Sequence, residues 1–278
     1  MPENKHLVLS SFFLKIIAMV AVLSDHIAFV FVSPSLFTYD LMRIIGRLAF
    51  ILFAFFVSEG IVKTRNYDRY LLRLFIMYLV MQALSIVAFS YDSSFAYPNV
   101  FATLLAGASF LTYFETKRWK RVYYLVPFIA VMIINYLFYY QKMNYLEIYT
   151  GDYAFYGLAL IIAFYIGRKI ALYLYAHYIP APNEDSENKS NEQNLQKQFV
   201  LNVASSVSLL FITFIWYILS VFSKSSTNMA LQSYGLITIF LLLLYNGKLG
   251  YNQKPFRIIY YLFFPVHLII IALISILI

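Results

Sequence analysis

Long apolar segments alternate with short polar segments along the whole chain. About 20 apolar residues in a helix cross the roughly 30 Å hydrocarbon core of a bilayer. The pattern therefore predicts an all-α polytopic integral membrane protein with nine transmembrane helices. The predicted spans are Ser11–Val32, Asp40–Val62, Tyr70–Ser90, Asn99–Phe114, Val122–Tyr140, Tyr153–His177, Phe199–Phe222, Met229–Tyr245 and Phe256–Ile278. The fourth span is short and contains Gly107, which favours a helix that is tilted, partly re-entrant or buried against its neighbours.

The positions of the basic residues predict the orientation of these helices. Sixteen of the 21 Lys and Arg residues lie in every second connecting segment, and the opposite segments contain only Lys142 and Lys224. Cytoplasmic loops of membrane proteins carry the excess of Lys and Arg. The basic side is therefore predicted to face the cytoplasm, with the N-terminus inside and the C-terminus outside.

The composition favours the same class of protein. Apolar residues make up 62% of the chain and charged residues 12%, whereas a soluble domain carries about 25% charged residues. The net charge of +8 follows from the basic cytoplasmic loops, so no nucleic-acid partner is predicted. The absence of cysteine excludes disulfides and thiolate nucleophiles. The N-terminus runs into a full-length apolar segment without a small-residue cleavage site, so we interpret this segment as a retained signal anchor.

A single polar tract interrupts the apolar pattern. Residues 180–198 are rich in Pro, Asn, Glu, Ser, Lys and Gln, which is the composition of a disordered linker. The tract is predicted to lie on the cytoplasmic side, between six spans at about 11–178 and three spans at about 199–278. We therefore expect one membrane domain over residues 1–278, divided by a cytoplasmic connector.

Five ionisable residues fall inside predicted spans. Asp25 and His26 lie two-thirds of the way along the first span, Arg43 and Arg47 begin the second, and His267 lies in the last. Such groups cost about 2.5–3.5 kcal/mol near the bilayer centre, so they usually face a polar interior and mark a functional site. Spans one and two form a hairpin, which brings Asp25 and His26 to a depth similar to that of Arg47 in the outer half of the membrane.

The spacing of these residues indicates their chemistry. Arg43 and Arg47 are four residues apart and share a helix face, and an Asp25 carboxylate can pair with either guanidinium group. A neutral His26 imidazole beside these cations suits a general base. A purely structural Asp25–Arg47 ion pair is the alternative. His267 is either a packed, hydrogen-bonded residue or a second polar group, and Pro265 favours a kink near it.

Several segments resemble the TraX family of membrane proteins. The matching segments occur in family order over the whole chain: Leu14–Ala18, Ser24–Ile27, Arg43–Phe50, Phe53–Phe55, Glu59–Gly60, Arg69–Leu74, Asn99–Leu105, Tyr245–Lys248 and Tyr261–Leu268. The Asp25-His26 element and the Arg43-Ile44-Ile45-Gly46-Arg47 element are fairly specific when they occur together. The family pattern often has Pro-Leu-His near the end, where this chain has Pro265-Val266-His267.

The resemblance implies an acyltransferase in the bacterial cytoplasmic membrane. Members are associated with acetylation of a pilin N-terminus, and the family is similar to the transmembrane acyltransferases. The resemblance implies an acetyl group moving from cytoplasmic acetyl-CoA, without a metal, to an envelope or secreted acceptor. That acceptor would be an amine or hydroxyl, such as a protein N-terminus or a glycan, at the membrane or its outer side. His26 then matches the essential histidine, Asp25 its partner, and Arg43 and Arg47 the basic pair.

Further residues are predicted to bind the two substrates. Lys63, Arg65 and Lys248 lie in predicted cytoplasmic loops, where they are expected to attract the phosphates of the acyl-CoA. His267, Asn99 and Asp152 are expected to bind the acceptor, although an Asp at the start of a helix also serves as an N-cap. Apart from lipids and substrates, no partner is predicted.

Two other classes of function stay open. A transporter for small anions or protons would use the same buried charges, but its two halves usually resemble each other, and this chain has no visible repeat. A scaffold without chemistry would need the charges only for stability. Gly-rich phosphate loops, paired metal-binding histidines and serine nucleophile motifs do not occur in the sequence.

Overall fold

The computed structural model describes residues 7–91, 98–116, 119–139, 141–143, 149–151, 153–178, 187–222 and 231–277. These residues form an all-α protein, with one isolated β-bridge between Leu9 and Tyr245. The helices are α1 (Ser11–Phe31), α2 (Phe37–Lys63), α3 (Tyr67–Tyr91), α4 (Val100–Thr116), η2 (Trp119–Tyr124), α5 (Leu125–Tyr139), α6 (Ala154–Tyr178), α7 (Glu187–Phe222), η4 (Gln232–Ile237), α9 (Thr238–Leu243) and α10 (Lys254–Leu277).

The prediction of a polytopic membrane protein is confirmed. Within the described residues, seven helices are long and apolar enough to cross a bilayer, and each coincides with a predicted span. The predicted fourth and eighth spans are also helical, but they form the shorter apolar helices Val100–Thr116 and Gln232–Leu243. The orientation of the spans stays a prediction.

The polar tract is helical where the structure describes it. Helix α7 begins at Glu187, so the prediction of a disordered linker is wrong for residues 187–198. These residues include Glu, Lys and Gln, which have high helix propensity, and they continue directly into the apolar part of α7. The hydroxyl of Tyr175 in α6 donates a hydrogen bond to the carbonyl of Gln193, which connects this polar part of α7 to α6. Residues 180–186 of the predicted linker lie outside the described part of the chain.

The chain divides into two compact units. The first unit comprises residues 1–52, 163–260 and 270–278. Here residues 9–12 pair along the loop that follows α9. The Leu9 amide donates to the carbonyl of Leu244, and the Asn246 amide donates to the carbonyl of Leu9, both at 2.9 Å. Asn202 of α7 donates to the Tyr245 carbonyl at 2.6 Å, so two separate segments, residues 9–12 and α7, hold this loop in place.

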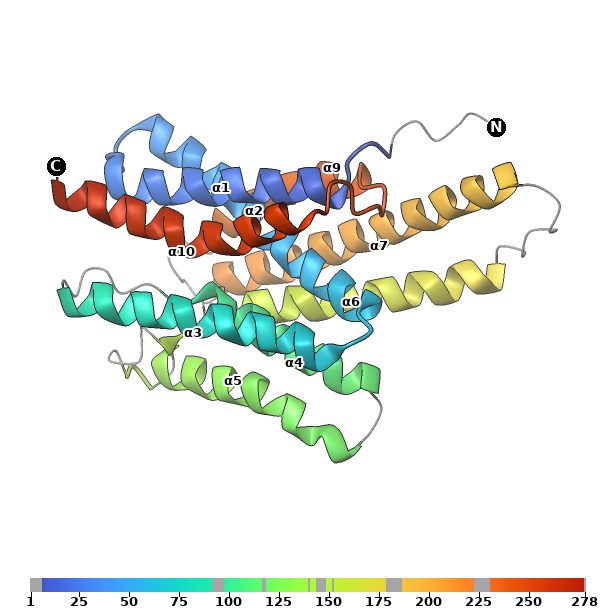
Figure 1. Cartoon of the computed structure of the whole chain (residues 1–278), viewed down its shortest axis with the longest axis horizontal. Coiled ribbons are helices and arrows are strands. Elements are labelled where there is room, and N and C mark those ends of the chain that lie inside the picture. Colours follow the sequence, from blue (N-terminus) through green and yellow to red (C-terminus); the bar gives the residue numbers. More distant parts are fainter. Residues whose placement is uncertain are drawn as a thin grey trace. The chain divides into compact units, whose positions relative to one another are not determined.

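The second unit comprises residues 53–162 and 261–269, with α4 at its centre. Helix α4 packs against α3 on one side and α5 on the other (Figure 1). Most of its residues from Phe101 to Thr112 are buried, and Gly107 lies directly against Ile161. Of the alternatives predicted for the short fourth span, burial against its neighbours is therefore confirmed. A helix enclosed by protein does not need the length that a lipid-facing span needs.

Candidate functional site

A tight hairpin between α1 and α2 positions the charged residues of the first unit. Helix α1 ends where the Val32 amide donates to the Ala28 carbonyl, and the Leu36 amide donates to the Ser33 carbonyl in the turn that follows. Deeper in the hairpin, the Ser24 hydroxyl donates to the carbonyl of Met42 at 3.4 Å. This part of α1 therefore lies close to the first turns of α2.

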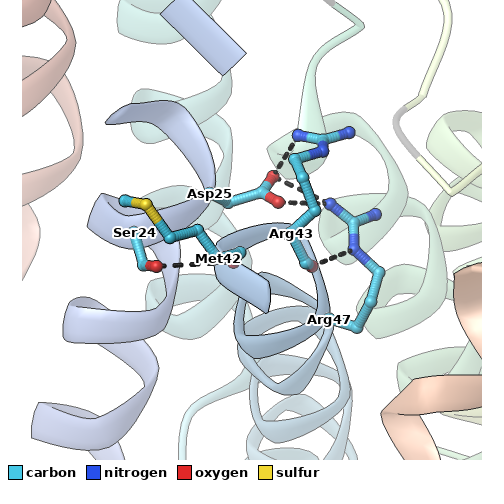
Figure 2. A network of polar contacts seen from close by, with 5 residues as sticks. All are labelled: Ser24, Asp25, Met42, Arg43 and Arg47. Atoms are coloured by element: carbon cyan, nitrogen blue, oxygen red, sulfur yellow. Dashed lines mark hydrogen bonds and ion pairs between the residues drawn. The ribbon is translucent and has the colours of Figure 1, made fainter. Parts of the chain in front are cut away.

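Asp25 contacts both arginines of α2, as Figure 2 shows. The Nη2 atom of Arg47 lies 2.7 Å from Oδ1 and 2.8 Å from Oδ2 of the carboxylate. The Nη1 atom of Arg43 lies 2.9 Å from Oδ2. The sequence predicted that Asp25 would pair with one guanidinium group or the other. In the structure it bridges the two.

The arginines are held independently of Asp25 as well. The Nε–H of Arg47 donates to the backbone carbonyl of Arg43 at 3.3 Å, one turn earlier in the same helix (Figure 2). The guanidinium of Arg43 lies over the ring of Phe29, 5.4 Å from its centroid, in a cation–π arrangement. Each guanidinium group thus has a second contact that fixes its plane.

The network is largely shielded from solvent and has surplus positive charge. The exposed fractions of the side chains are 8% for Arg47, 14% for Asp25 and 18% for Arg43. When all three groups are ionised, one carboxylate faces two guanidinium groups, so the trio has a net charge of +1. Charges interact more strongly in such surroundings than in water. The cluster is therefore suited to attract an anion or a developing oxyanion.

Gly46 makes this arrangement possible, although the sequence analysis did not assign it to the site. A Cβ atom at position 46 would lie 2.5 Å from both Cβ and Cγ of Asp25, far inside van der Waals contact. Gly46 is three residues after Arg43 and precedes Arg47, so it lies on the same face of α2. The sequence feature that could have identified Gly46 is a glycine inside an apolar helix, between two charged residues that share a helix face.

His26 follows Asp25 on α1 and is half-buried. Successive helical residues are about 100° apart around the helix axis, so the imidazole leaves α1 on a face adjacent to the one that holds the ion cluster. The role of His26 as a base stays a prediction.

The residues predicted to bind coenzyme A lie in different surroundings. Lys63 pairs with Glu59 at 2.8 Å, and its side chain is 44% exposed whereas that of Glu59 is 7% exposed. Arg65 is exposed just after α2 ends. Both belong to the second unit, whereas Lys248 belongs to the first. Lys248 is exposed on the loop after α9, which residues 9–12 and α7 hold in place. It follows Gly247, whose φ of 73° is in the left-handed region.

Asn99 has a structural function at the start of α4. Its Oδ1 accepts the amide hydrogen of Phe101 at 3.0 Å, which is N-cap geometry. Its Nδ2 donates to the Tyr78 carbonyl and to Oε1 of Gln82. Both amide hydrogens of this side chain are therefore in use. Its backbone amide donates to the carbonyl of Thr150, two residues before Asp152, which itself lies outside the described residues.

His267 is buried in an aromatic part of the second unit. Its ring stacks on that of Phe263, with centroids 4.5 Å apart and planes inclined at 14°. The Nδ1 atom lies 2.6 Å from the Phe263 carbonyl oxygen. Both residues belong to α10, which contains Pro265 between them and continues through it.

Comparison with known proteins adds a family match. The family model described as TraX protein matches residues 10–179, which include Asp25, His26, Arg43 and Arg47. Over 79 residues the chain is 37% identical to the probable fimbrial assembly protein FimC, serogroup H1, of Dichelobacter nodosus. That stretch covers 28% of this chain and 32% of the relative, so the chain matches about a third of that protein's length. No solved structure matches.

Proposed function

Because the chain belongs to the TraX family, we propose that it is an acyltransferase in the bacterial cytoplasmic membrane. In this proposal it transfers an acetyl group from cytoplasmic acetyl-CoA to an amine or hydroxyl at the membrane or its outer side. The observation that carries the proposal is the largely shielded trio of Asp25, Arg43 and Arg47, adjacent to His26 on α1. Its net positive charge is complementary to the negative charge that develops on the carbonyl oxygen during acyl transfer.

The proposed reaction assigns a role to each of these residues. The acceptor nitrogen or oxygen attacks the thioester carbonyl carbon and loses its proton to His26. The carbonyl oxygen becomes an oxyanion, which the guanidinium groups stabilise. When the intermediate collapses, the carbon–sulfur bond breaks, and the sulfur leaves as coenzyme A after taking the proton from His26. Asp25 contacts both guanidinium groups and holds the arginines in position.

Lys63, Arg65 and Lys248 are proposed to attract the phosphates of the donor from the cytoplasmic side. In this scheme Lys63 keeps its contact with Glu59. Acceptor binding is proposed for His267 and Asp152. Asn99 fits that role less well, because its amide hydrogens already bond Tyr78 and Gln82. The partial match to a probable fimbrial assembly protein supports an envelope protein as the acceptor.

The proposal is tested with radiolabelled acetyl-CoA, the purified protein in nanodiscs and a washed envelope fraction. We expect label to appear in an envelope component only when the protein is present. The control is the Arg47→Gln variant, which lacks the buried guanidinium. No transfer by the wild-type protein would overturn the proposed function.

A transporter is the second candidate, because the same largely shielded trio, with a net charge of +1, would bind a small anion. If the protein is a transporter, we expect anion or proton flux into liposomes that contain the protein alone, without acetyl-CoA. Acetyl transfer without such flux favours the enzyme, and flux without transfer favours the transporter.

A further inference from the structure

A groove lies on the second unit between α3 and α5. Both helices pack against α4, and α4 supplies the floor of the groove with the buried residues Leu105 and Ser109. Leu72 and Phe75 of α3 line one wall, and Pro127 of α5 lines the other. The groove has a volume of about 270 Å³. Pockets that enclose drug-sized ligands hold about 300–1,000 Å³, so this groove suits a slender occupant.

The walls of the groove belong to apolar surface that a bilayer would cover. Leu72 and Phe75 are exposed and lie on α3, which is long and apolar enough to cross a membrane. On the other wall, Val126 and Ile129 beside Pro127 are exposed as well. Hydrocarbon chains surround such surfaces in a membrane. A chain in the groove contacts three helices at once, so it gains more dispersion energy than a chain on a single convex helix face.

One end of the groove is polar. The hydroxyl of Tyr124 donates a hydrogen bond to Oδ1 of Asp68 in the first turn of α3. Asp68, Tyr123 and Tyr124 are all part of the lining of the groove, and Tyr123 is 54% exposed. Amphipathic tyrosine rings are typical of the headgroup layer of a membrane. The groove therefore extends from an end with interfacial character to an apolar end.

Two arginines lie in the segments that the bond between Asp68 and Tyr124 joins. Arg69 follows Asp68 and is exposed, and Arg121 is half-buried in η2, three residues before Tyr124. Both arginines are among the basic residues that are predicted to face the cytoplasm. Basic pockets between transmembrane helices on that side bind the phosphates of lipid headgroups, and a guanidinium group can form two parallel hydrogen bonds with a phosphate.

We propose that the groove is a phospholipid-binding site, in which one acyl chain lies over α4 between α3 and α5 and the phosphate contacts Arg69 and Arg121. A hydrocarbon chain alone would match the walls but not the arginines, and a free phosphate would match the arginines but not the walls. A phospholipid matches both. The bound lipid connects α3 with α5 and stabilises the second unit, whether or not the protein transfers acetyl groups.

The first test is native mass spectrometry of the purified full chain with three probes at equal concentration. The probes are dioleoylphosphatidylglycerol, dioleoylglycerol, which has the same chains without the phosphate, and inorganic phosphate. We expect the phospholipid alone to bind and to raise the unfolding temperature in detergent. Equal binding of dioleoylglycerol or of inorganic phosphate would overturn the proposal. A protein dimer that excludes the lipid would assign the groove to a second copy of the chain and would overturn it as well.

The second test removes the charges at the polar end. Arg69→Gln and Arg121→Gln should each raise the Kd of the phospholipid at least about tenfold, since each removes hydrogen bonds to a charged group. Lys142→Gln is the matched control, because it removes one exposed positive charge of the same unit, just beyond the other end of α5. We expect it to leave the Kd unchanged. Equal weakening by Arg69→Gln and Lys142→Gln would mean that binding follows net charge only, and the site would be refuted.

The third test removes apolar contact from the wall. Leu72→Ala is compared with Leu79→Ala, since both leucines are exposed on α3 but Leu79 lies about two turns farther along the helix. We expect Leu72→Ala to raise the Kd at least about fourfold, the factor for one lost buried methylene group, and Leu79→Ala to have no effect. Equal effects would contradict a chain seated in the groove. Because both side chains are exposed, the unfolding temperature without lipid should not change, which separates lost binding from misfolding.

Discussion

The carboxylate of Asp25 on α1 lies against the bare backbone of Gly46 on α2. A methyl group at position 46 would overlap Cβ and Cγ of Asp25, with centres only 2.5 Å apart. Arg43 and Arg47 flank Gly46 on the same helix face, so the missing side chain allows the carboxylate to reach both guanidinium groups. The ion cluster therefore depends on a close approach of two backbones as much as on its charged residues.

Gly46→Ala should separate α1 from α2 and break at least one of the contacts of Asp25. Forcing a methyl group into a filled space usually costs about 1–3 kcal/mol, so we expect a lower unfolding temperature in detergent and a large loss of acetyl transfer. Ile45→Ala is the matched control, because Ile45 is exposed on the same turn. Unchanged transfer by the Gly46→Ala variant would mean that the close approach is not needed for function.

Asp25→Asn should destabilise the protein, because it removes the negative charge that both guanidinium groups contact. Removing one partner of a buried ion pair costs about 3–5 kcal/mol in soluble proteins, and we expect the same direction here. Thermal unfolding of the purified variant measures the effect.

A double-mutant cycle tests the reason for that loss. In an Arg43→Gln background the remaining charges change from one carboxylate and one guanidinium to a single guanidinium when Asp25→Asn is added. The penalty of Asp25→Asn should therefore be smaller there than in the wild-type background. Equal penalties in both backgrounds would show that Arg43 and Asp25 do not interact energetically.

Lysine should replace Arg43 more successfully than Arg47. Arg47 contacts both carboxylate oxygens and also bonds the carbonyl of Arg43, and a lysine ammonium cannot reproduce this planar set of donors. Arg43 makes one ion-pair contact and is more exposed. We expect at least about a tenfold loss of transfer for Arg47→Lys, or about 1.4 kcal/mol of transition-state stabilisation. A smaller loss is expected for Arg43→Lys, and the reverse order would contradict the assignment of Arg47 as the principal donor.

Much of the fold follows from the sequence because a bilayer demands long apolar helices. All nine predicted spans coincide with helices. The shared face of Arg43 and Arg47, and their proximity to Asp25, follow from helical spacing and the short connection at Ser33–Leu36. That Asp25 contacts both arginines was not predictable, since it depends on the backbone approach at Gly46.

Other features depended on information that the sequence pattern does not contain. The composition of residues 187–198 is typical of a disordered linker, but these residues extend an adjacent helix. Their helix propensity, together with the apolar helix that directly follows them, outweighs the composition. Asn99 was predicted to bind a substrate because it is polar at the end of a span. Its N-cap geometry could be recognised only with the partners Phe101, Tyr78 and Gln82 in place.

Asn99→Ala distinguishes the structural role of Asn99 from substrate binding. Loss of an N-cap side chain costs about 0.5–2 kcal/mol, and the change also removes a partner from buried Gln82. We therefore expect a lower unfolding temperature with no change in the amount of envelope fraction needed for half-maximal transfer. An unchanged unfolding temperature with a higher acceptor requirement would instead support acceptor binding.

His26→Ala tests the proposed base, and His177→Ala is its matched control. Both replace a histidine on a long apolar helix, but His26 adjoins the ion cluster on α1, whereas His177 is exposed at the end of α6. Losing a general base typically lowers the rate about 10²–10⁴-fold. We therefore expect acetyl transfer by the His26→Ala variant to become undetectable while its unfolding temperature stays near that of the wild type. The His177→Ala variant should remain active and stable. If the His26→Ala variant remains active and the His267→Ala variant does not, the assignment of His26 as the base is wrong.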